Sequence, residues 1–412
     1  MLGFSIFTGL LAGSYPAFYL SGFDTIKVLK GTFRVGKSAS FPRKILVVAQ
    51  FNVSIMLIIG TIVVYRQIIF AKNRPVGYIK DGLITVDMST QGVMQHYDAL
   101  RNELLSSGAV ENVAESSSPS TNVQNSMLGY DWKGRDPSFI PIIGTFFVGS
   151  DFGKTLNWNI REGRDFSRDF STDSGGIILN EAAAKLVGFK HPVGQLIKWH
   201  NKDHIILGVI NDMVMESPYA SVEPTFFMLD NRKIHVITIR IKRDIPVHDV
   251  LTRIAAVFKK YEPATPFEYR FTHDIYAHKF AYEQYIGKLA SIFSMLAIFI
   301  SCLGLFGLAS FVAEQRTKEI GVRKVLGATV FSLWRLLSKE FAMLLFISFC
   351  IATPIAYYLM HNWLQNYEYR TTLAWWIFGA AGIGALLITL LTVSFQSIKA
   401  AMANPVKSLR TE

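Results

Sequence analysis

Long runs without a charged residue limit this chain more than any other feature. An α-helix rises about 1.5 Å per residue, so about 20 apolar residues cross a hydrocarbon core about 30 Å thick. Four uncharged runs reach that length: residues 45–65, 289–313, 341–360 and 371–398. The sequence therefore predicts several membrane-spanning helices.

A fifth uncharged run opens the sequence at residues 1–23. A secretory signal peptide carries basic residues before its apolar part, and none precede this run. A basic cluster follows it instead, within residues 27–44. We interpret the run as a membrane helix, or the end of one, whose C-terminal end lies in the cytoplasm.

The distribution of charge predicts which segments lie on which side of the membrane. The formal net charge is +11, but residues 70–287 carry 24 Lys and Arg against 25 Asp and Glu, a net charge of −1. The other residues carry 18 against 6, a net charge of +12. Because Lys and Arg are enriched on cytoplasmic flanks, the basic segments are predicted to be cytoplasmic and the neutral segment external. The basic excess then indicates orientation and contact with membrane lipid, and we expect no nucleic-acid partner.

These features predict a multi-pass α-helical membrane protein with a large mixed α+β extracytoplasmic domain between the first and second helices of a four-helix unit. Aromatic residues that favour the membrane interface cluster near the predicted outer loop: Trp363, Tyr367, Tyr369, Trp375 and Trp376. The predicted layout is a membrane helix at 1–23, a cytoplasmic basic linker at 24–44, a membrane helix at 45–69, the extracytoplasmic domain at 70–286, a membrane helix at 287–313, a cytoplasmic segment at 314–340, membrane helices at 341–360 and 371–398, and a cytoplasmic tail at 399–412.

Alternating and helical patterns within the external segment predict its mixed α+β character. A hairpin turn is predicted at Asn201–Asp203, between two apolar runs. Strands are predicted at Gly82–Val86, Ile140–Phe147, Gly176–Leu179, His204–Val209 and His235–Ile241, and helices at Gln95–Leu105, Glu181–Val187 and Val247–Tyr261.

Residues Gly31–Ser38 match the phosphate-loop pattern GxxxxGK[ST]. That loop binds phosphate when a strand precedes it and a helix N-terminus follows. Here a basic linker precedes the motif, and Pro42 and a membrane helix follow it. We therefore favour a chance match whose cations lie near anionic lipid.

Two groups of histidines are candidate metal sites. His200 and His204 have a spacing that binds metal on a helix, but the residues between them favour a turn. His273, Asp274, His278 and Glu283 lie on a predicted helix that enters the membrane, where a solvated face is the simpler interpretation. We expect no catalytic residue, cofactor or metal ligand, although a membrane-tethered enzyme using these histidines remains the rival class.

The two ends of the sequence are similar to each other. Residues 10–30 and 390–410 align without a gap, and the similarity continues past the apolar part into the basic tail, as with Lys27 and Lys407. Chance similarity between membrane-helix ends is one explanation. The other, which we favour, is a duplicated unit whose last helix occurs twice, so that Met1 would be an internal start, a truncation or part of a split gene.

Residues 314–329 combine charge with helical character between two membrane helices. A cytoplasmic loop that is merely enriched in Lys and Arg would not require Gly321 and Gly327, or the acidic residues among the basic ones. A helix of this kind lies in the membrane interface or docks into a groove of a partner.

This segment resembles the coupling segment of MacB/FtsX-like ABC transporter permeases, whose motif runs roughly as R-x-x-E-I-G-hydrophobic-x-K/R-x-hydrophobic-G-A. The external segment also resembles the periplasmic core domain of that family at Gly163–Ser167, Ile178–Ala183, Pro192–Gly194 and Leu207–Asp212. The resemblance implies that the ATPase-coupling residues are Arg316, Lys318, Glu319, Ile320, Gly321, Arg323, Lys324, Gly327 and Ala328.

The resemblance implies a non-catalytic permease subunit in the bacterial inner membrane, with its large domain in the periplasm. Its expected partners are an ABC-type ATPase dimer on a separate chain, a periplasmic protein, and a second permease unit, either a homodimer partner or a missing first half. Many Bacteroidetes members carry two such units. The expected function is export or extraction of a peptide, drug or lipoprotein-type substrate by mechanotransmission. The alternative is FtsX-like or peptide-sensing signalling that controls a partner hydrolase or kinase.

Overall fold

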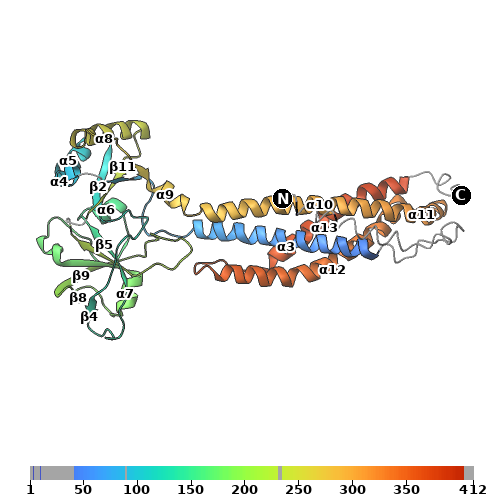
Figure 1. Ribbon diagram of the computed structural model, residues 1–412, viewed down its shortest axis with the longest axis horizontal. Coiled ribbons are helices and arrows are strands. Elements are labelled where there is room, and N and C mark those ends of the chain that lie inside the picture. Colours follow the sequence, from blue (N-terminus) through green and yellow to red (C-terminus); the bar gives the residue numbers. More distant parts are fainter. Residues whose placement is uncertain (1–2, 4–9, 11–40, 89–90, 231–233, 403–412) are drawn as a thin grey trace. The chain divides into compact units, whose positions relative to one another are not determined.

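The computed structural model describes residues 3, 10, 41–88, 91–230 and 234–402 (Figure 1). Most of the predicted 1–23 helix, the Gly31–Ser38 motif and most of the basic linker lie outside the described residues. The chain divides into two units, which are treated separately below. The helical unit comprises Met1–Met56, Ser294–Pro354 and Gly379–Glu412, and the mixed unit comprises Leu57–Phe293 and Ile355–Phe378.

The apolar runs form long helices: α3 (Phe41–Lys72), α10 (Ala281–Gln315), α12 (Val330–Gln365) and α13 (Trp375–Met402). Within the described part of the chain, these four are long and apolar enough to cross a membrane. Pro354 lies inside α12, as membrane helices tolerate when neighbouring groups satisfy the freed backbone carbonyl. Since the α+β domain separates α3 from α10 in the chain, the predicted fold class is confirmed.

Polar contacts link the helices inside the helical unit. The hydroxyl oxygens of Ser54 in α3 and Ser301 in α10 lie 3.0 Å apart. The Trp334 indole in α12 donates to Ser394 Oγ in α13 at 2.8 Å. Such contacts stabilise membrane helix packing, because lipid supplies no hydrophobic driving force between helices.

A twelve-stranded sheet forms the framework of the mixed unit, with the order β12-β1-β11-β2-β5-β10-β7-β9-β8-β4, and with β3 beside β5 and β6 beside β9. The strands are β1 (Leu83–Asp87), β2 (Val110–Ser116), β3 (Ser126–Met127), β4 (Tyr130–Trp132), β5 (Ile143–Val148), β6 (Ile160–Gly163), β7 (Gly176–Asn180), β8 (Leu196–Trp199), β9 (Lys202–Ile210), β10 (Thr225–Leu229), β11 (Val236–Ile241) and β12 (Arg270–Phe271).

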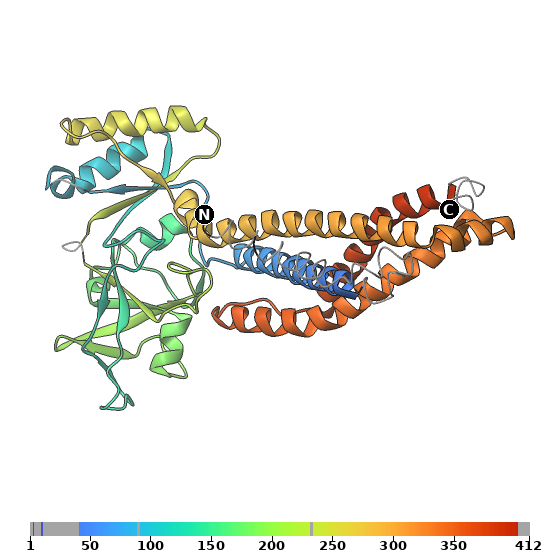
Figure 2. The same ribbon diagram turned by 45° about the vertical axis from the view of Figure 1, so that its right-hand side comes forward.

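The two faces of the sheet at β1 belong to different hydrophobic cores, because successive strand residues point to opposite faces. Ile84 packs with the core of α5 and α8, which lie side by side in Figure 2. Leu83 packs with the core that contains α6. The domain helices are α4 (Gln91–Gln95), α5 (Tyr97–Ser106), α6 (Phe152–Leu156), α7 (Glu181–Val187), α8 (Val247–Tyr261) and α9 (Thr272–His278).

The predicted strands correspond to β1, β5, β7, β9 and β11, and the predicted helices correspond to α4 with α5, α7 and α8, so these assignments are confirmed. The hairpin is also present, but its turn lies earlier than predicted. His200 and Asn201 form it with φ values of 47° and 61°, the left-handed conformation that two-residue hairpins require. Lys202 and Asp203 already belong to β9.

Candidate functional sites

Residues 314–340, predicted to be cytoplasmic and called the cytoplasmic segment below, contain a short helix, α11 (Thr317–Val325), that ends at a glycine-dependent stop. Gly327 has φ +88°, and the Ala328 N–H donates to the Arg323 carbonyl at 2.9 Å. This six-residue closure after a left-handed residue is the Schellman motif, which favours glycine at that position. The pattern Leu326-Gly327-Ala328 therefore sets where α11 ends.

Arg316, directly before α11, is paired inside the helical unit. Its guanidinium lies 3.0 Å from Glu340 Oε1 of α12, and Lys44 of α3 lies 3.4 Å from the same oxygen. One carboxylate thus ties the corner between α10 and α11 to two other helices. The contact holds Arg316 against α12.

The remaining predicted coupling residues occupy α11 and the turn after it. Glu319 and Arg323 form an exposed i,i+4 ion pair of 2.7 Å, whereas Ile320 and Gly321 are buried. Lys318 belongs to the first turn of α11, and Lys324 is half-buried near its end. The apolar residues of this segment lie in different environments, because Ile320 packs inward while Val325 and Leu326 are 67% and 81% exposed.

A second candidate site, in the mixed unit, surrounds the connection between α12 and α13, residues 366–374, which we call the outer loop. Gln67 of α3 is fully buried and uses both ends of its amide on this loop. Its Nε2 donates to the Tyr369 carbonyl at 2.9 Å, and its Oε1 accepts from the Thr371 N–H at 2.8 Å. The outer end of α3 is thereby held to the loop.

The outer loop is also held to the α+β domain. The Tyr369 N–H donates to the Tyr219 carbonyl at 2.8 Å, and the Ser221 N–H donates to Glu368 Oε2 at 2.6 Å. The hydrogen bond from Ser221 lowers the pKa of Glu368 below its usual range.

Arg74, just after α3, strengthens the same connection. It donates to the carbonyls of Pro218 and Ala220 at 3.0 and 2.7 Å, and its guanidinium lies 4.3 Å from the centre of the Tyr369 ring. We call the outer loop, Gln67, Arg74 and residues 217–223 the outer junction.

The outer junction was not predicted from the sequence, although Arg66 and Gln67 end the uncharged run 45–65 with two polar positions. Of the aromatic residues expected at the membrane interface, Tyr367 packs against Tyr219 with ring centres 5.1 Å apart, and Tyr369 stacks on Phe70 at 4.6 Å. Trp375, by contrast, is 84% exposed. Tyr367 and Tyr369 therefore pack against other parts of the protein.

The candidate histidine sites do not have the geometry of a metal centre. His200 lies in the hairpin turn and His204 in β9, so they do not share a helical face. His273 pairs with Asp81, with 3.3 Å between Nδ1 and Oδ1. Among the described residues, no three His, Cys, Asp or Glu side chains lie close enough to hold a metal ion.

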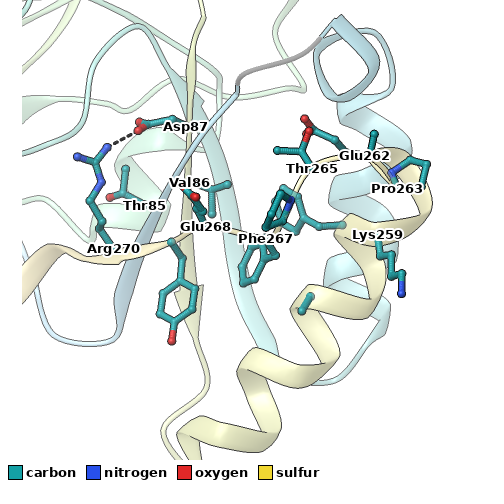
Figure 3. Close-up of a pocket in the computed structure, with 15 residues that line it drawn as sticks. Thr85, Val86, Asp87, Lys259, Glu262, Pro263, Thr265, Phe267, Glu268 and Arg270 are labelled. Atoms are coloured by element: carbon teal, nitrogen blue, oxygen red, sulfur yellow. Dashed lines mark hydrogen bonds and ion pairs between the residues drawn. The ribbon is translucent and has the colours of Figure 1, made fainter.

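An open hollow of about 1220 Å³ lies at the edge of the sheet, between β1, β12 and the end of α8 (Figure 3). Asp87 and Arg270 form an ion pair across the edge strands. Phe267 packs on Phe258 with ring centres 4.9 Å apart. Side chains of both signs of charge and aromatic rings line this hollow.

Glu115 of β2 is a buried carboxyl group of the α+β domain with a raised pKa. Burial, and then the nearby carboxylates of Asp98 and Asp151, raise the pKa of Glu115 to about 7, while Arg168 acts in the opposite direction. Its side chain is therefore partly protonated near neutral pH.

Comparison with known families identifies both parts of the chain. Residues 50–257 match the MacB-like periplasmic core domain, and residues 291–405 match the FtsX-like permease C-terminal region. Membrane helices that carry such a domain define the permease component of an ABC transporter. The chain belongs to the MacB/FtsX-like permease family, and as an ABC transporter permease it requires an ATPase partner.

Individual relatives are distant. A macrolide export ATP-binding/permease protein, MacB, of Agrobacterium fabrum is 23% identical over 194 residues, which cover 44% of this chain and 30% of that protein. Its name combines ATP-binding and permease functions, whereas the family models that match this chain describe permease regions.

Two solved structures are similar to part of this chain. The periplasmic region of MacB from Actinobacillus actinomycetemcomitans has 13% identity and a TM-score of 0.36, covering 48% of this chain and 92% of that one. The extracellular domain of the Gram-positive ABC-type transporter YknZ has 12% identity and a TM-score of 0.33, covering 46% and 97%.

Proposed function

We propose that this chain couples ATP binding and hydrolysis by a separate ATPase dimer to movement of its periplasmic domain, and that this movement exports or extracts a substrate without a pathway through the membrane helices. The observation that carries the proposal is the outer junction. Gln67 and Arg74 connect α3 both to the outer loop and to the α+β domain, so a tilt of the helices moves that domain.

The cytoplasmic segment supplies the opposite end of this mechanism. Val325 and Leu326 are exposed beside the Glu319–Arg323 ion pair. An amphipathic helix with apolar anchors and flanking charges is suited to a groove in a partner protein. We infer that the nine predicted coupling residues form this docking element, with Arg316 and Gly327 shaping it and Glu319 and Arg323 facing the ATPase.

A charge swap tests the docking. Replacing Glu319→Arg together with Arg323→Glu keeps the i,i+4 pair within α11 but inverts the surface that the ATPase meets. We expect co-purification with the ATPase and stimulation of ATP turnover to fall by about tenfold or more, because like charges across an interface are repulsive. Undiminished binding and turnover would overturn the proposal.

The chain offers a matched control for this swap. Asp131 and Arg135 also form an i,i+4 pair, of 2.9 Å, but in the α+β domain. The corresponding swap, Asp131→Arg with Arg135→Asp, changes the same charges and is expected to leave ATPase binding unchanged.

The substrate class that we propose is a peptide, drug or lipoprotein-type molecule in the periplasm, handled with a periplasmic partner protein. The macrolide export named for the relative from Agrobacterium fabrum supports export. Genes beside this one provide the test. A neighbouring ATPase and periplasmic adaptor are expected, whereas a neighbouring histidine kinase or cell-wall hydrolase would favour the signalling alternative.

We further propose that the chain lies in the bacterial inner membrane and works with a second permease unit, either another copy or the first half of a duplicated, Bacteroidetes-type permease. The similarity of residues 10–30 to residues 390–410 supports the duplication. The mass of the purified complex tests the pairing, because two permease units are expected for each ATPase dimer and a single unit would contradict it.

A further inference from the structure

A groove of about 980 Å³ in the mixed unit lies between the outer halves of α3 and α10 and the start of α13. The two helices approach closely at Gly287, where an added Cβ would lie 3.5 Å from Val64 and Ile68. They run side by side in both Figure 1 and Figure 2. Most of the surface that lines the groove is apolar, and Ile62, Ile69, Phe70 and Trp376 contribute to it.

The charged residues of the groove all have the same sign. Arg66, Lys72 and Lys288 line it, and among the described lining residues none is acidic. These cations are unexpected here, because Lys and Arg are usually enriched at the cytoplasmic ends of membrane helices, whereas these three lie at the ends that lead into the α+β domain.

Arg66 provides an independent indication of a ligand. Its Nη1 atom is buried and has no hydrogen-bond partner within the described part of the protein. The guanidinium lies 5.2 Å from the centre of the Trp376 ring, also in the groove. A buried guanidinium N–H without an acceptor is costly, so an anionic oxygen in this position would stabilise the site.

The position of the groove along the membrane helices suits a lipid. The uncharged run of α3 ends at Tyr65 and that of α10 begins at Leu289, so Arg66 and Lys288 mark the boundary between hydrocarbon and headgroups. Ile62 and Tyr65 of the groove lie on the hydrocarbon side of this boundary, and Arg66 and Lys288 lie at it. A phospholipid has the same arrangement, with an apolar chain below an anionic phosphate.

We propose that this groove binds one phospholipid of net negative charge from the outer leaflet, with its phosphate at Arg66 and Lys288 and an acyl chain along α3. Planar guanidinium groups form strong charge-assisted hydrogen bonds with phosphate. The lipid completes the surface between α3, α10 and α13, next to Thr371 of the outer junction. The proposal does not rest on the coupling function, since binding requires no ATPase.

The test measures lipid retained by the full-length chain in detergent, by native mass spectrometry, after titration with phosphatidylglycerol or phosphatidylcholine. We expect phosphatidylglycerol to bind at least about tenfold more tightly, and Arg66→Gln with Lys288→Gln to abolish this preference. Equal binding of the two lipids, or full retention of the preference in the double variant, would overturn the proposal.

Further variants separate the lipid from a free anion and from misfolding. Ser291→Trp places a large side chain in the groove but keeps the cations, and it is expected to weaken phosphatidylglycerol binding. Glycerol phosphate, a headgroup without chains, is expected not to compete at equal concentration, and competition by it would reduce the site to a simple anion site. Arg370→Gln removes an exposed cation outside the groove lining and is expected to have no effect.

Discussion

The outer junction and the cytoplasmic segment differ in how far their side chains find partners within the chain, whether through hydrogen bonds or through burial. At the outer junction, Gln67 is buried and both ends of its amide are bonded. In the cytoplasmic segment, Leu326 is 81% exposed and Val325 is 67% exposed. The polar groups of Gln67 find their partners within this chain. The cytoplasmic segment instead exposes apolar surface, which often marks a site of contact with a partner protein.

This difference indicates how the two regions divide the work of coupling. A connection that transmits movement has to be made of contacts that persist, such as buried hydrogen bonds whose loss is costly. A docking surface has to be able to associate and therefore remains exposed in the isolated chain. The comparison predicts that changes in the first region damage transmission and changes in the second damage binding.

The largest effect is expected from removing the exposed apolar anchors. Val325→Ser with Leu326→Ser should weaken ATPase association by about 3–6 kcal/mol, the value of burying two such side chains. The melting temperature of the chain should stay the same, because neither side chain packs in its core. Co-purification and thermal unfolding measure the two quantities. Ile140→Ser, which alters an equally exposed residue of the α+β domain, is the control, and equal ATPase binding by both variants would refute the distinction.

The next effect is expected at Gln67. Gln67→Leu keeps the side-chain volume but leaves the Tyr369 carbonyl and the Thr371 N–H without partners, which should cost about 2–4 kcal/mol of folding free energy. ATPase binding should be retained, while stimulation of ATP turnover by substrate is lost. Gln365→Leu, which removes only a bond to His361 on the exposed side of α12, should be neutral. Reduced ATPase binding in Gln67→Leu would contradict the prediction that the outer junction affects transmission without affecting binding.

A smaller effect is expected on the pH dependence of the stability of the α+β domain. The pKa of Glu115 is raised to about 7 by burial, so the folded domain holds a proton that the unfolded chain has already released above its ordinary pKa of 4.5. Stability contributed by this group is therefore full below pH 4.5 and is lost as pH rises towards 7. Glu115→Gln should flatten the dependence of the melting temperature between pH 5 and 8. An unchanged dependence in this variant would show that Glu115 is not responsible.

The smallest effect is expected at Glu368, which is exposed. Glu368→Gln retains an oxygen that accepts from the Ser221 N–H and removes only the charge, so ATP turnover should change by less than about twofold. A loss as large as that of Gln67→Leu would mean that the exposed contact, rather than the buried one, holds the junction.

The sequence predicted the membrane helices and the α+β strands well, because uncharged length and alternation are local properties. It could not predict the outer junction, since Gln67 and its partner Tyr369 lie 302 residues apart. It also placed Arg316 in the docking motif, although the fold pairs this residue with Glu340 of the next long helix. Such contacts depend on which helices become neighbours, which a motif does not encode. The docking role of all nine coupling residues, Arg316 included, stays a prediction.

The central claim is that the outer loop and the α+β domain move as one body. It is tested most directly by joining them covalently. Ser221→Cys and Glu368→Cys, in a chain with Cys302→Ala and Cys350→Ala, are bridged with a short reducible crosslinker, and substrate-stimulated ATP turnover is measured with the ATPase bound. Turnover unchanged by the crosslink is the result that we predict. Turnover that stops on crosslinking and returns on reduction would show that the two parts separate during the cycle, and would contradict the account.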